Sequence, residues 1–258
     1  MNQSTEIPFN SGLFKELISL MWEATDAILE VYRLGELNTI LKGDESPVTH
    51  ADLAAHNVLV NGLSQLTPNI PVVSEEDPRS HQIPESHQRY WLIDPLDGTK
   101  EFIKGNDEFT SNLALIDSHR TVYGFVTVPT RGILYHGGGT YGAYRTNGAG
   151  EEARIQCQRQ TLTTRVIASR SHLNLETAAF IEAIQTPVEL IRAGSSLKFL
   201  RIAEGSADIY PRLAASREWD TAAGHAILEG AGGSVTQIDG NRLIYGKNQQ
   251  NPGFIAKN

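Results

Sequence analysis

The 258-residue sequence contains one cysteine, no long apolar run and no excess of basic residues. The lone cysteine, Cys157, excludes an internal disulfide and is typical of a reducing compartment. No apolar stretch approaches the ~20 residues of a transmembrane helix. The opening residues, MNQSTEIPFN, lack the basic and apolar regions of a secretory signal peptide. These absences predict a cytoplasmic protein with no transmembrane segment.

The charge balance is acidic, because 22 Lys and Arg residues stand against 30 Asp and Glu, for a formal net charge of −8. Nucleic-acid-binding proteins use basic patches to neutralise phosphates, so nucleic acid is not an expected partner. If the substrate is a small anion, a local source of positive charge must attract it against the overall field of the protein.

The N-terminal half of the sequence predicts helices followed by a sheet. Apolar residues recur at helical spacing from Ser11 to about Leu34. Thr49 is placed to cap a second helix from about His50 to Leu66, which Thr67 and Pro68 would end. Short β-rich segments separated by turn residues then predict an antiparallel meander. These segments are residues 71–73, 111–116, 121–129, 132–136 and 142–145. The glycine-rich run at 137–142 precedes β-forming residues rather than a helix, so it predicts a hairpin turn and not a phosphate loop.

Beyond residue 155 the pattern changes to alternating strands and helices. Strands are predicted at 166–169, 188–193 and 207–210, and helices at 174–184, 197–204 and 221–229. Such alternation is typical of an α/β layer with a mainly parallel sheet. The predicted fold class is therefore α+β in the first half and α/β in the second.

An acidic stretch, WLIDPLDGTKEF at residues 91–102, combines a buried strand with two aspartates. Asp94 and Asp97 would repel each other unless one is protonated or a cation lies between them. Mg²⁺ prefers such hard oxygen ligands, and the Leu96 carbonyl could add another. Gly98 and Thr99 would then open a helix whose free N–H groups could bind a phosphate.

A purely structural interpretation of these aspartates stays open at this point. Asp97 could simply cap the helix, and Asp94 could be a surface turn residue. Other carboxylates occur at comparable positions: Glu75 follows a predicted strand and Asp52 lies at a predicted helix start beside Thr49. Asp220 precedes a predicted helix and could be only its cap. Their number favours a metal site.

The combination resembles the inositol monophosphatase superfamily of Mg²⁺-dependent, lithium-sensitive phosphomonoesterases, and most closely its bacterial CysQ-type 3'(2'),5'-bisphosphate nucleotidases. The motifs that carry the resemblance are SPVTHAD, VVSEEDP, WLIDPLDGTKEFIK, IASRSH, GSSLKF, YPRL and WDTAAGHA, in this order over residues 46–226. The resemblance implies a layered α-β-α-β-α sandwich with an antiparallel-rich N-terminal sheet. It also implies that residues 1–155 form a metal-binding α+β subdomain and that residues 156–258 form an α/β subdomain completing the active site.

The resemblance also implies the roles of individual residues. One Mg²⁺ would be held by Glu75, Asp94 and the Leu96 carbonyl. A second would be held by Asp94, Asp97 and Asp220. A water on the first ion would attack the phosphate, aligned by Thr99 and Asp52. Glu75 would also be a catalytic residue. No covalent phosphoenzyme would form. Substrate contacts are expected from Glu75, Leu96, Asp97, Gly98, Thr99, Ser171, His172, Ser196, Lys198, Arg212 and Asp220.

A bisphosphate substrate needs cationic groups away from the metals, and Lys198 and Arg212 fit that need. A helical lysine is more often simply solvated, which is the competing interpretation of Lys198. The implied reaction is hydrolysis of the 3'-phosphate of adenosine 3',5'-bisphosphate to AMP in sulfate assimilation, with 3'-phosphoadenylyl sulfate as a second substrate. An inositol or sugar-phosphate monophosphatase is the alternative, and a non-catalytic metal-dependent nucleotide sensor the more remote one. The resemblance also allows peripheral association with the inner membrane.

Overall fold

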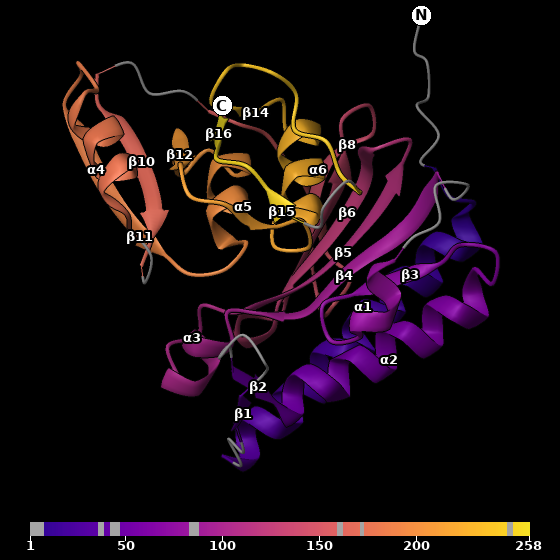
Figure 1. Cartoon of the computed structure of the whole chain (residues 1–258). Helices are drawn as coiled ribbons and strands as arrows, with labels where there is room; N and C mark the ends of the chain where they lie inside the picture. The colour runs from indigo at the N-terminus through magenta and orange to yellow at the C-terminus, as the bar shows by residue number, and fades with distance from the viewer. Residues whose placement is uncertain are drawn as a thin grey trace, which may run out of the picture.

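The structure is a computed structural model that describes residues 8–35, 39–41, 47–82, 88–158, 162–170, 173–246 and 250–258. Its elements stack in five layers (Figure 1). Helices α1 (Ser11–Leu34) and α2 (His50–Leu66) cover the outer face of a seven-stranded sheet. Helices α5 (Leu197–Ala203) and α6 (Ala222–Gly230) fill the middle, followed by a five-stranded sheet and α4 (Leu175–Glu182). The predicted α-β-α-β-α sandwich is confirmed.

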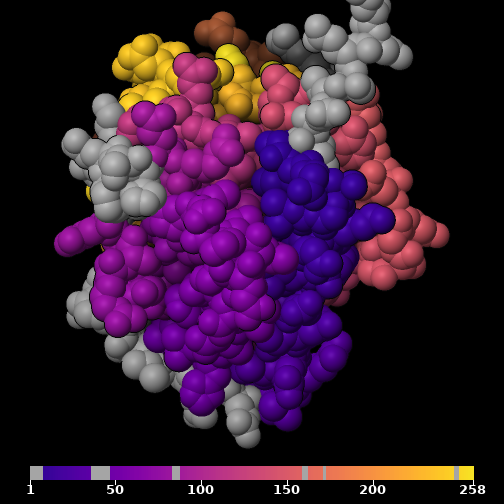
Figure 2. All heavy atoms as spheres, turned by 90° about the vertical axis from the view of Figure 1, so that its right-hand side faces the viewer, coloured from indigo at the N-terminus to yellow at the C-terminus, as the bar shows by residue number. Residues whose placement is uncertain are grey.

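Both N-terminal helices have the predicted bounds, and local signals explain where they start. The Asn10 side chain accepts a hydrogen bond from the N–H of Leu13, and Gly35 ends α1 in the left-handed conformation. Thr49 caps α2 in a capping box with Asp52. Figure 2 shows these two helices, in indigo and purple, covering this side of the molecule.

The seven-stranded sheet has the order β3-β4-β5-β6-β7-β8-β9. Its strands are β3 (Val72–Ser74), β4 (Arg89–Asp97), β5 (Thr110–Asp117), β6 (Arg120–Val128), β7 (Ile133–Gly138), β8 (Gly142–Asn147) and β9 (Glu152–Ile155). β3 runs parallel to β4, and each later pair is antiparallel. The predicted meander is thus confirmed, and the glycine-rich run is the β7–β8 hairpin rather than a phosphate loop.

The five-stranded sheet has the order β11-β10-β12-β16-β14. Its strands are β10 (Thr164–Ser169), β11 (Val188–Ala193), β12 (Ile209–Arg212), β14 (Ser234–Gln237) and β16 (Phe254–Lys257). β10 pairs in parallel with β11 and β12, whereas β16 runs antiparallel to β12 and β14. Because β12 and β14 are both antiparallel to β16, they run in the same direction as each other and as β10 and β11. The prediction of a mainly parallel sheet is therefore confirmed, with β16 as its one reversed strand.

Short elements connect these helices and strands. They are β1 (Thr39–Leu41), β2 (Pro47–Thr49), the 3₁₀ turns η1 (Pro78–His81) and η2 (Pro129–Arg131), α3 (Thr99–Lys104), β13 (Ser216–Arg217) and β15 (Gln250–Asn251).

Two hydrophobic clusters form the core. One lies between α1, α2 and the seven-stranded sheet and includes Trp91 and Phe102. The other lies between the two sheets and joins residues of both halves, such as Leu92 and Ile227. α6 lies so close to β6 that a Cβ on Gly124 would come within 2.3 Å of the Ala223 carbonyl oxygen. The division into subdomains at residue 155 stays a prediction, and this shared core holds the two halves together.

Candidate active site

The end of β4 carries the two aspartates of the acidic stretch. Asp94 is paired with Asn112 of β5, and Asp97 is paired with Thr110, so β4 contains one residue more than its partner over this interval. Residues three apart in a regular strand point to opposite faces, and a bulge of one residue corrects this. Asp94 and Asp97 can therefore both line the same cavity, and both do.

Glu75 is placed beside them by the parallel pairing of β3 with β4. Ser74 is opposite Ile93 in the register, and the N–H of Glu75 donates to the Ile93 carbonyl oxygen over 3.2 Å. The next residues along the two strands are therefore Glu75 and Asp94. Neighbouring strands lie about 4.8 Å apart, so the two carboxylates belong to one group.

Asp220 reaches the same cavity from the segment just before α6. Its interpretation as a helix cap is wrong, because the cap of α6 is Thr221 and no side-chain cap is formed. The cap of α3 is Gly98, so Asp97 is not a cap either. Asp94 is only 2% exposed, which excludes a surface turn residue.

These side chains surround a cavity of about 250 Å³. Its lining includes most of the predicted site residues, namely Glu75, Asp94, Leu96, Asp97, Gly98, Thr99, Lys198, Arg212 and Asp220. Ser196 lies next to the lining, where its hydroxyl donates to the Asp220 carbonyl oxygen over 2.9 Å. Ser171 and His172 lie outside the described residues.

The acidic end of the cavity is electrostatically strained. Burial and neighbouring carboxylates raise the pKa of Asp94 well above its ordinary value. Burial also raises the pKa of Asp97, although Lys198, Ser196 and Asn112 partly oppose it. For Asp220, burial followed by the charges of Asp97 and Glu75 raises the pKa to about 8. Like charges in one cavity are stabilised by a cation.

The donor set fits a hard divalent cation. The lining contains five carboxylate residues, the four described above and Glu101, together with Leu96, and oxygen ligands of this kind suit Mg²⁺. Within the part of the chain that the structure describes, no three His, Cys, Asp or Glu side chains already stand in a chelating arrangement. A bound cation would offset the mutual repulsion of the carboxylates in this cavity.

Thr99 links the cavity to α2. Its hydroxyl lies 3.1 Å from Oδ1 of Asp52 and 3.3 Å from the Leu96 carbonyl oxygen. Asp52 lies behind the cavity and is 1% exposed. Its other oxygen, Oδ2, accepts from the N–H and the hydroxyl of Thr49 at 2.7 and 2.6 Å. Asp52 is thus both a capping residue and the partner of Thr99.

Cationic side chains line the same cavity. Lys198 is 5% exposed, so the interpretation as a solvated lysine is wrong. Its ammonium donates to the Ser195 carbonyl oxygen and lies 5.3 Å from the centre of the Tyr210 ring. Arg212 and Lys100 also line the cavity. The site therefore combines an acidic end with nearby positive charges.

Some residues of the site were not predicted from sequence. Asn112 is buried and donates to Oδ2 of Asp97 over 3.3 Å and to the Ser196 hydroxyl over 3.0 Å. Glu108 accepts from the Gly194 N–H over 2.9 Å and pairs with Arg170 at 2.7 Å. The only sequence feature that could have indicated a role for Asn112 is its position as a polar residue within the apolar strand SNLALI. Nothing in the sequence marks Glu108.

The remaining titratable candidates lie apart from the cavity lining. His225 is buried against the Tyr245 hydroxyl at 2.8 Å, and His50 is exposed. Burial raises the pKa of Cys157 to about 11, so this thiol is unreactive at neutral pH.

Comparison with known proteins identifies the family of this chain. The sequence model of the inositol monophosphatase family matches residues 10–258. The chain belongs to the inositol monophosphatase family. No helix within the described ranges is both long and apolar enough to cross a membrane.

Relatives within the inositol monophosphatase family cover nearly the whole chain. The 3'(2'),5'-bisphosphate nucleotidase CysQ of Escherichia coli K12 is 41% identical over 245 residues, which is 94% of this chain and 98% of that protein. CysQ of Buchnera aphidicola is 38% identical and covers 95% of this chain and 93% of its own length. The crystal structure of CysQ from Bacteroides thetaiotaomicron has a TM-score of 0.84 at 37% identity, with 97% and 98% coverage of the two chains.

Proposed function

We propose that this chain is a metal-dependent 3'(2'),5'-bisphosphate nucleotidase that hydrolyses the 3'-phosphate of adenosine 3',5'-bisphosphate to AMP and phosphate. The observation that carries the proposal is the convergence of Glu75, Asp94, Asp97 and Asp220 with Lys198 on one cavity. Its support in the family is the 41% identity to nucleotidases named CysQ. The role in sulfate assimilation and the use of 3'-phosphoadenylyl sulfate belong to the same proposal.

Two Mg²⁺ ions are the proposed cofactors. Glu75, Asp94 and the Leu96 carbonyl would hold one, and Asp94, Asp97 and Asp220 the other. When bound, such ions supply positive charge to the attacking and leaving oxygens of an in-line displacement. The raised pKa values of the aspartates support the proposal, because they reflect a negative cluster that a cation would stabilise.

Thr99 and Asp52 would activate the nucleophilic water. The Thr99 hydroxyl uses its hydrogen to donate to Oδ1 of Asp52. The lone pairs of its oxygen therefore remain available to accept a hydrogen bond from a water in the cavity. As that water attacks phosphorus, the bond from phosphorus to the 3'-oxygen breaks, the water's proton passes to Thr99 and the Thr99 proton passes to Asp52. The departing 3'-oxygen takes up a proton from solvent water and leaves as the 3'-hydroxyl of AMP. Burial raises the pKa of Asp52, which makes it a better proton acceptor than a surface carboxylate. Water attacks directly, so no phosphoenzyme forms.

The scissile phosphate would rest against Gly98 and Thr99. Gly98 has a φ of +95°, and a Cβ there would lie 3.1 Å from the Glu108 carbonyl oxygen. Glycine therefore suits both the backbone conformation and the tight space at this point. Lys198 and Arg212 would bind the second phosphate of the substrate, assisted by Ser196 and, by resemblance, Ser171 and His172.

Phosphate release from a panel of substrates tests the proposal. The panel contains adenosine 3',5'-bisphosphate, inositol 1-phosphate and fructose 1,6-bisphosphate, each with and without Mg²⁺. Fastest release from the nucleotide, dependent on Mg²⁺, is the expected result. Faster release from either other substrate supports the inositol or sugar phosphatase instead. Nucleotide binding without any release supports the sensor.

A further inference from the structure

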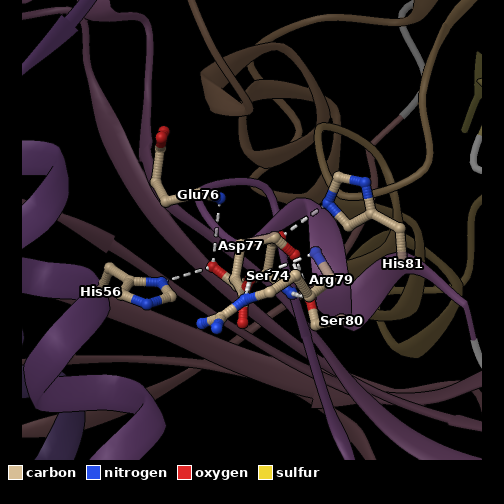
Figure 3. A network of polar contacts seen from close by, with 7 residues as sticks. All are labelled: His56, Ser74, Glu76, Asp77, Arg79, Ser80 and His81. Carbon is tan, nitrogen blue, oxygen red and sulfur yellow. Dashed lines mark hydrogen bonds and ion pairs between the residues drawn. The ribbon is translucent and has the colours of Figure 1, made fainter.

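The turn that follows β3 is held by a polar network centred on Ser74, the residue before Glu75 (Figure 3). β3 is the edge strand of the seven-stranded sheet, so the outward-facing backbone groups of Ser74 need partners other than a strand. The Ser74 N–H donates to the Ser80 hydroxyl over 3.0 Å. The Ser74 carbonyl oxygen accepts from Nε2 of His81 over 2.8 Å. Both partners come from η1.

Nε2 of His81 is the nearest donor to that carbonyl oxygen, to which the N–H of Asp77 also donates over 3.2 Å. The Ser80 hydroxyl has one proton, and its distance to the Asp77 carbonyl oxygen is 2.6 Å against 3.4 Å to that of Ser74. A carbonyl oxygen can only accept, so Nε2 of His81 carries a hydrogen. On the other side, the Ser74 hydroxyl lies 2.7 Å from Nδ1 of His56 and accepts from the Glu76 N–H.

The ring of His81 also touches the other half of the molecule. Its centre lies 5.0 Å from that of the Trp219 ring, with the two planes inclined by 35°. Trp219 is buried and immediately precedes Asp220. The His81 imidazole therefore contacts the backbone of Ser74, which precedes Glu75, and the side chain of Trp219, which precedes Asp220. Glu75 follows β3, whereas Asp220 lies just before α6.

We propose that His81 is a positioning residue that couples the turn carrying Glu75 to the segment carrying Asp220, and so sets the spacing of the acidic residues for a divalent cation. The inference rests on the proposed metal-dependent function. The carboxylates repel one another, so their spacing depends on contacts made from outside the cavity. The hydrogen bond of His81 holds one segment together with that of the Asp77 N–H, and the His81 ring contacts the other segment through Trp219.

Four variants separate these contacts. His81→Ala removes both. His81→Gln keeps an N–H donor of similar reach and loses the ring, whereas His81→Phe keeps a ring and loses the donor. Arg79→Ala is the matched control, because Arg79 lies in the same turn, is 92% exposed and pairs with Asp77.

Binding of Mg²⁺ alone, measured by titration calorimetry and by the Mg²⁺-induced rise in Tm, is the main readout. Residues that orient metal ligands typically contribute ten- to a hundredfold to metal affinity. We expect His81→Ala to weaken Mg²⁺ binding about tenfold or more, with kcat at saturating Mg²⁺ within about twofold of wild type. His81→Gln and His81→Phe should each lose part of the affinity, and Arg79→Ala none.

Several outcomes would overturn the inference. Wild-type Mg²⁺ affinity in His81→Ala would do so, as would an equal loss in Arg79→Ala. Full affinity in either His81→Gln or His81→Phe would show that one contact suffices and that His81 does not couple the two segments. If His81→Ala fails to fold, the other two variants decide. A wild-type protein that binds Mg²⁺ but releases no phosphate would contradict the proposed function and leave the role of His81 measurable.

Discussion

Thr99 lines the cavity and contacts Asp52 in the first turn of α2. Its hydroxyl lies 3.1 Å from a carboxylate that is itself held by the capping box of α2. Asp52 therefore belongs to the capping box of α2 and is also the proton acceptor in the proposed mechanism. A substitution that removes the hydroxyl of Thr99 would therefore interrupt the proposed proton route and leave the capping box of α2 intact.

Replacing Thr99 with Ala should lower kcat about a hundredfold or more, since the proposed route for the water's proton is lost. Tm should stay within about 2 °C of wild type, because the Thr49–Asp52 contacts remain. Thr99→Ser is the control, because it keeps the hydroxyl. Steady-state kinetics and thermal melts measure both effects. Unchanged turnover in Thr99→Ala would contradict the proposed mechanism.

Lys198 offers a second test at the level of single residues. Lys198→Ala should remove a charge-assisted contact to the second phosphate, worth about 1.5–3 kcal/mol. That corresponds to a loss of roughly 10- to 150-fold in kcat/KM with adenosine 3',5'-bisphosphate. The loss should be much smaller with adenosine 3'-monophosphate, which lacks the second phosphate.

Equal losses on the two substrates would place Lys198 at the scissile phosphate or in the fold instead. The structure makes this comparison necessary, because the charge of Lys198 also lowers the pKa of Asp97 at the acidic end of the cavity.

At the scale of elements, the acidic residues come from the turn after β3, the end of β4 and the segment before α6. In the metal-free protein the pKa of Asp220 rises from its ordinary value of 3.8 to about 8. The folded state then binds more protons than the unfolded state between these values, so stability falls as pH rises through this range. Asp94 and Asp97 have raised pKa values and act in the same direction.

The Tm of the metal-free protein should therefore fall between pH 5 and pH 8 on the order of several degrees, and Mg²⁺ should restore it. Asp220→Asn should raise the metal-free Tm at pH 8 and largely remove the effect of Mg²⁺. Calorimetric melts at several pH values, with chelator or with Mg²⁺, measure this. A Tm that rises with pH in chelator would contradict the assignment of the acidic cluster.

The elements with strong local signals were predictable from sequence. α1 and α2 have long periodic faces and clear caps, and the meander has turn residues between its strands. β14 and β16 were missed, because they follow the last predicted helix, where the alternation of strands and helices that marked β10 to β12 has ended. The bulge in β4 was also invisible: Asp94 and Asp97 could be assigned to one site, but the extra residue that turns them to one face appears only in the register.

The site itself was predictable where motifs name the residue. Asp94, Asp97 and Asp220 belong to ordered motifs, and the structure brings them together on one cavity. Asn112, Glu108 and His81 act through contacts between residues distant in sequence. Such contacts depend on tertiary packing, which the spacing of residues along the chain does not encode.

At the scale of the whole molecule, the cavity depends on how α6 packs against the seven-stranded sheet. Gly124 permits that contact, since a Cβ there would lie 2.3 Å from the Ala223 carbonyl oxygen. Gly124→Ala should force α6 away from β6 and destabilise the fold by about 1–3 kcal/mol. A loss of that size lowers Tm by about 2–4 °C for each kcal/mol.

Activity should fall with it, because Asp220 lies just before α6. Gly148→Ala is the matched control, since no atom lies within 4 Å of the added Cβ. Melting curves and phosphate release for the two variants make the comparison. Equal Tm values would show that the contact between α6 and the sheet can relax without cost.

The position of β16 has a consequence for the order in which the molecule is made. This strand, Phe254–Lys257, lies between β12 and β14, which precede it in the chain. During synthesis the ribosome makes β12 and β14 before β16, the strand that lies between them and pairs with both. The seven-stranded sheet, complete by residue 155, can form earlier. A growing chain would therefore carry Glu75, Asp94 and Asp97 in a folded sheet well before the second sheet closes, and hydrolysis would begin only after its last strand is inserted.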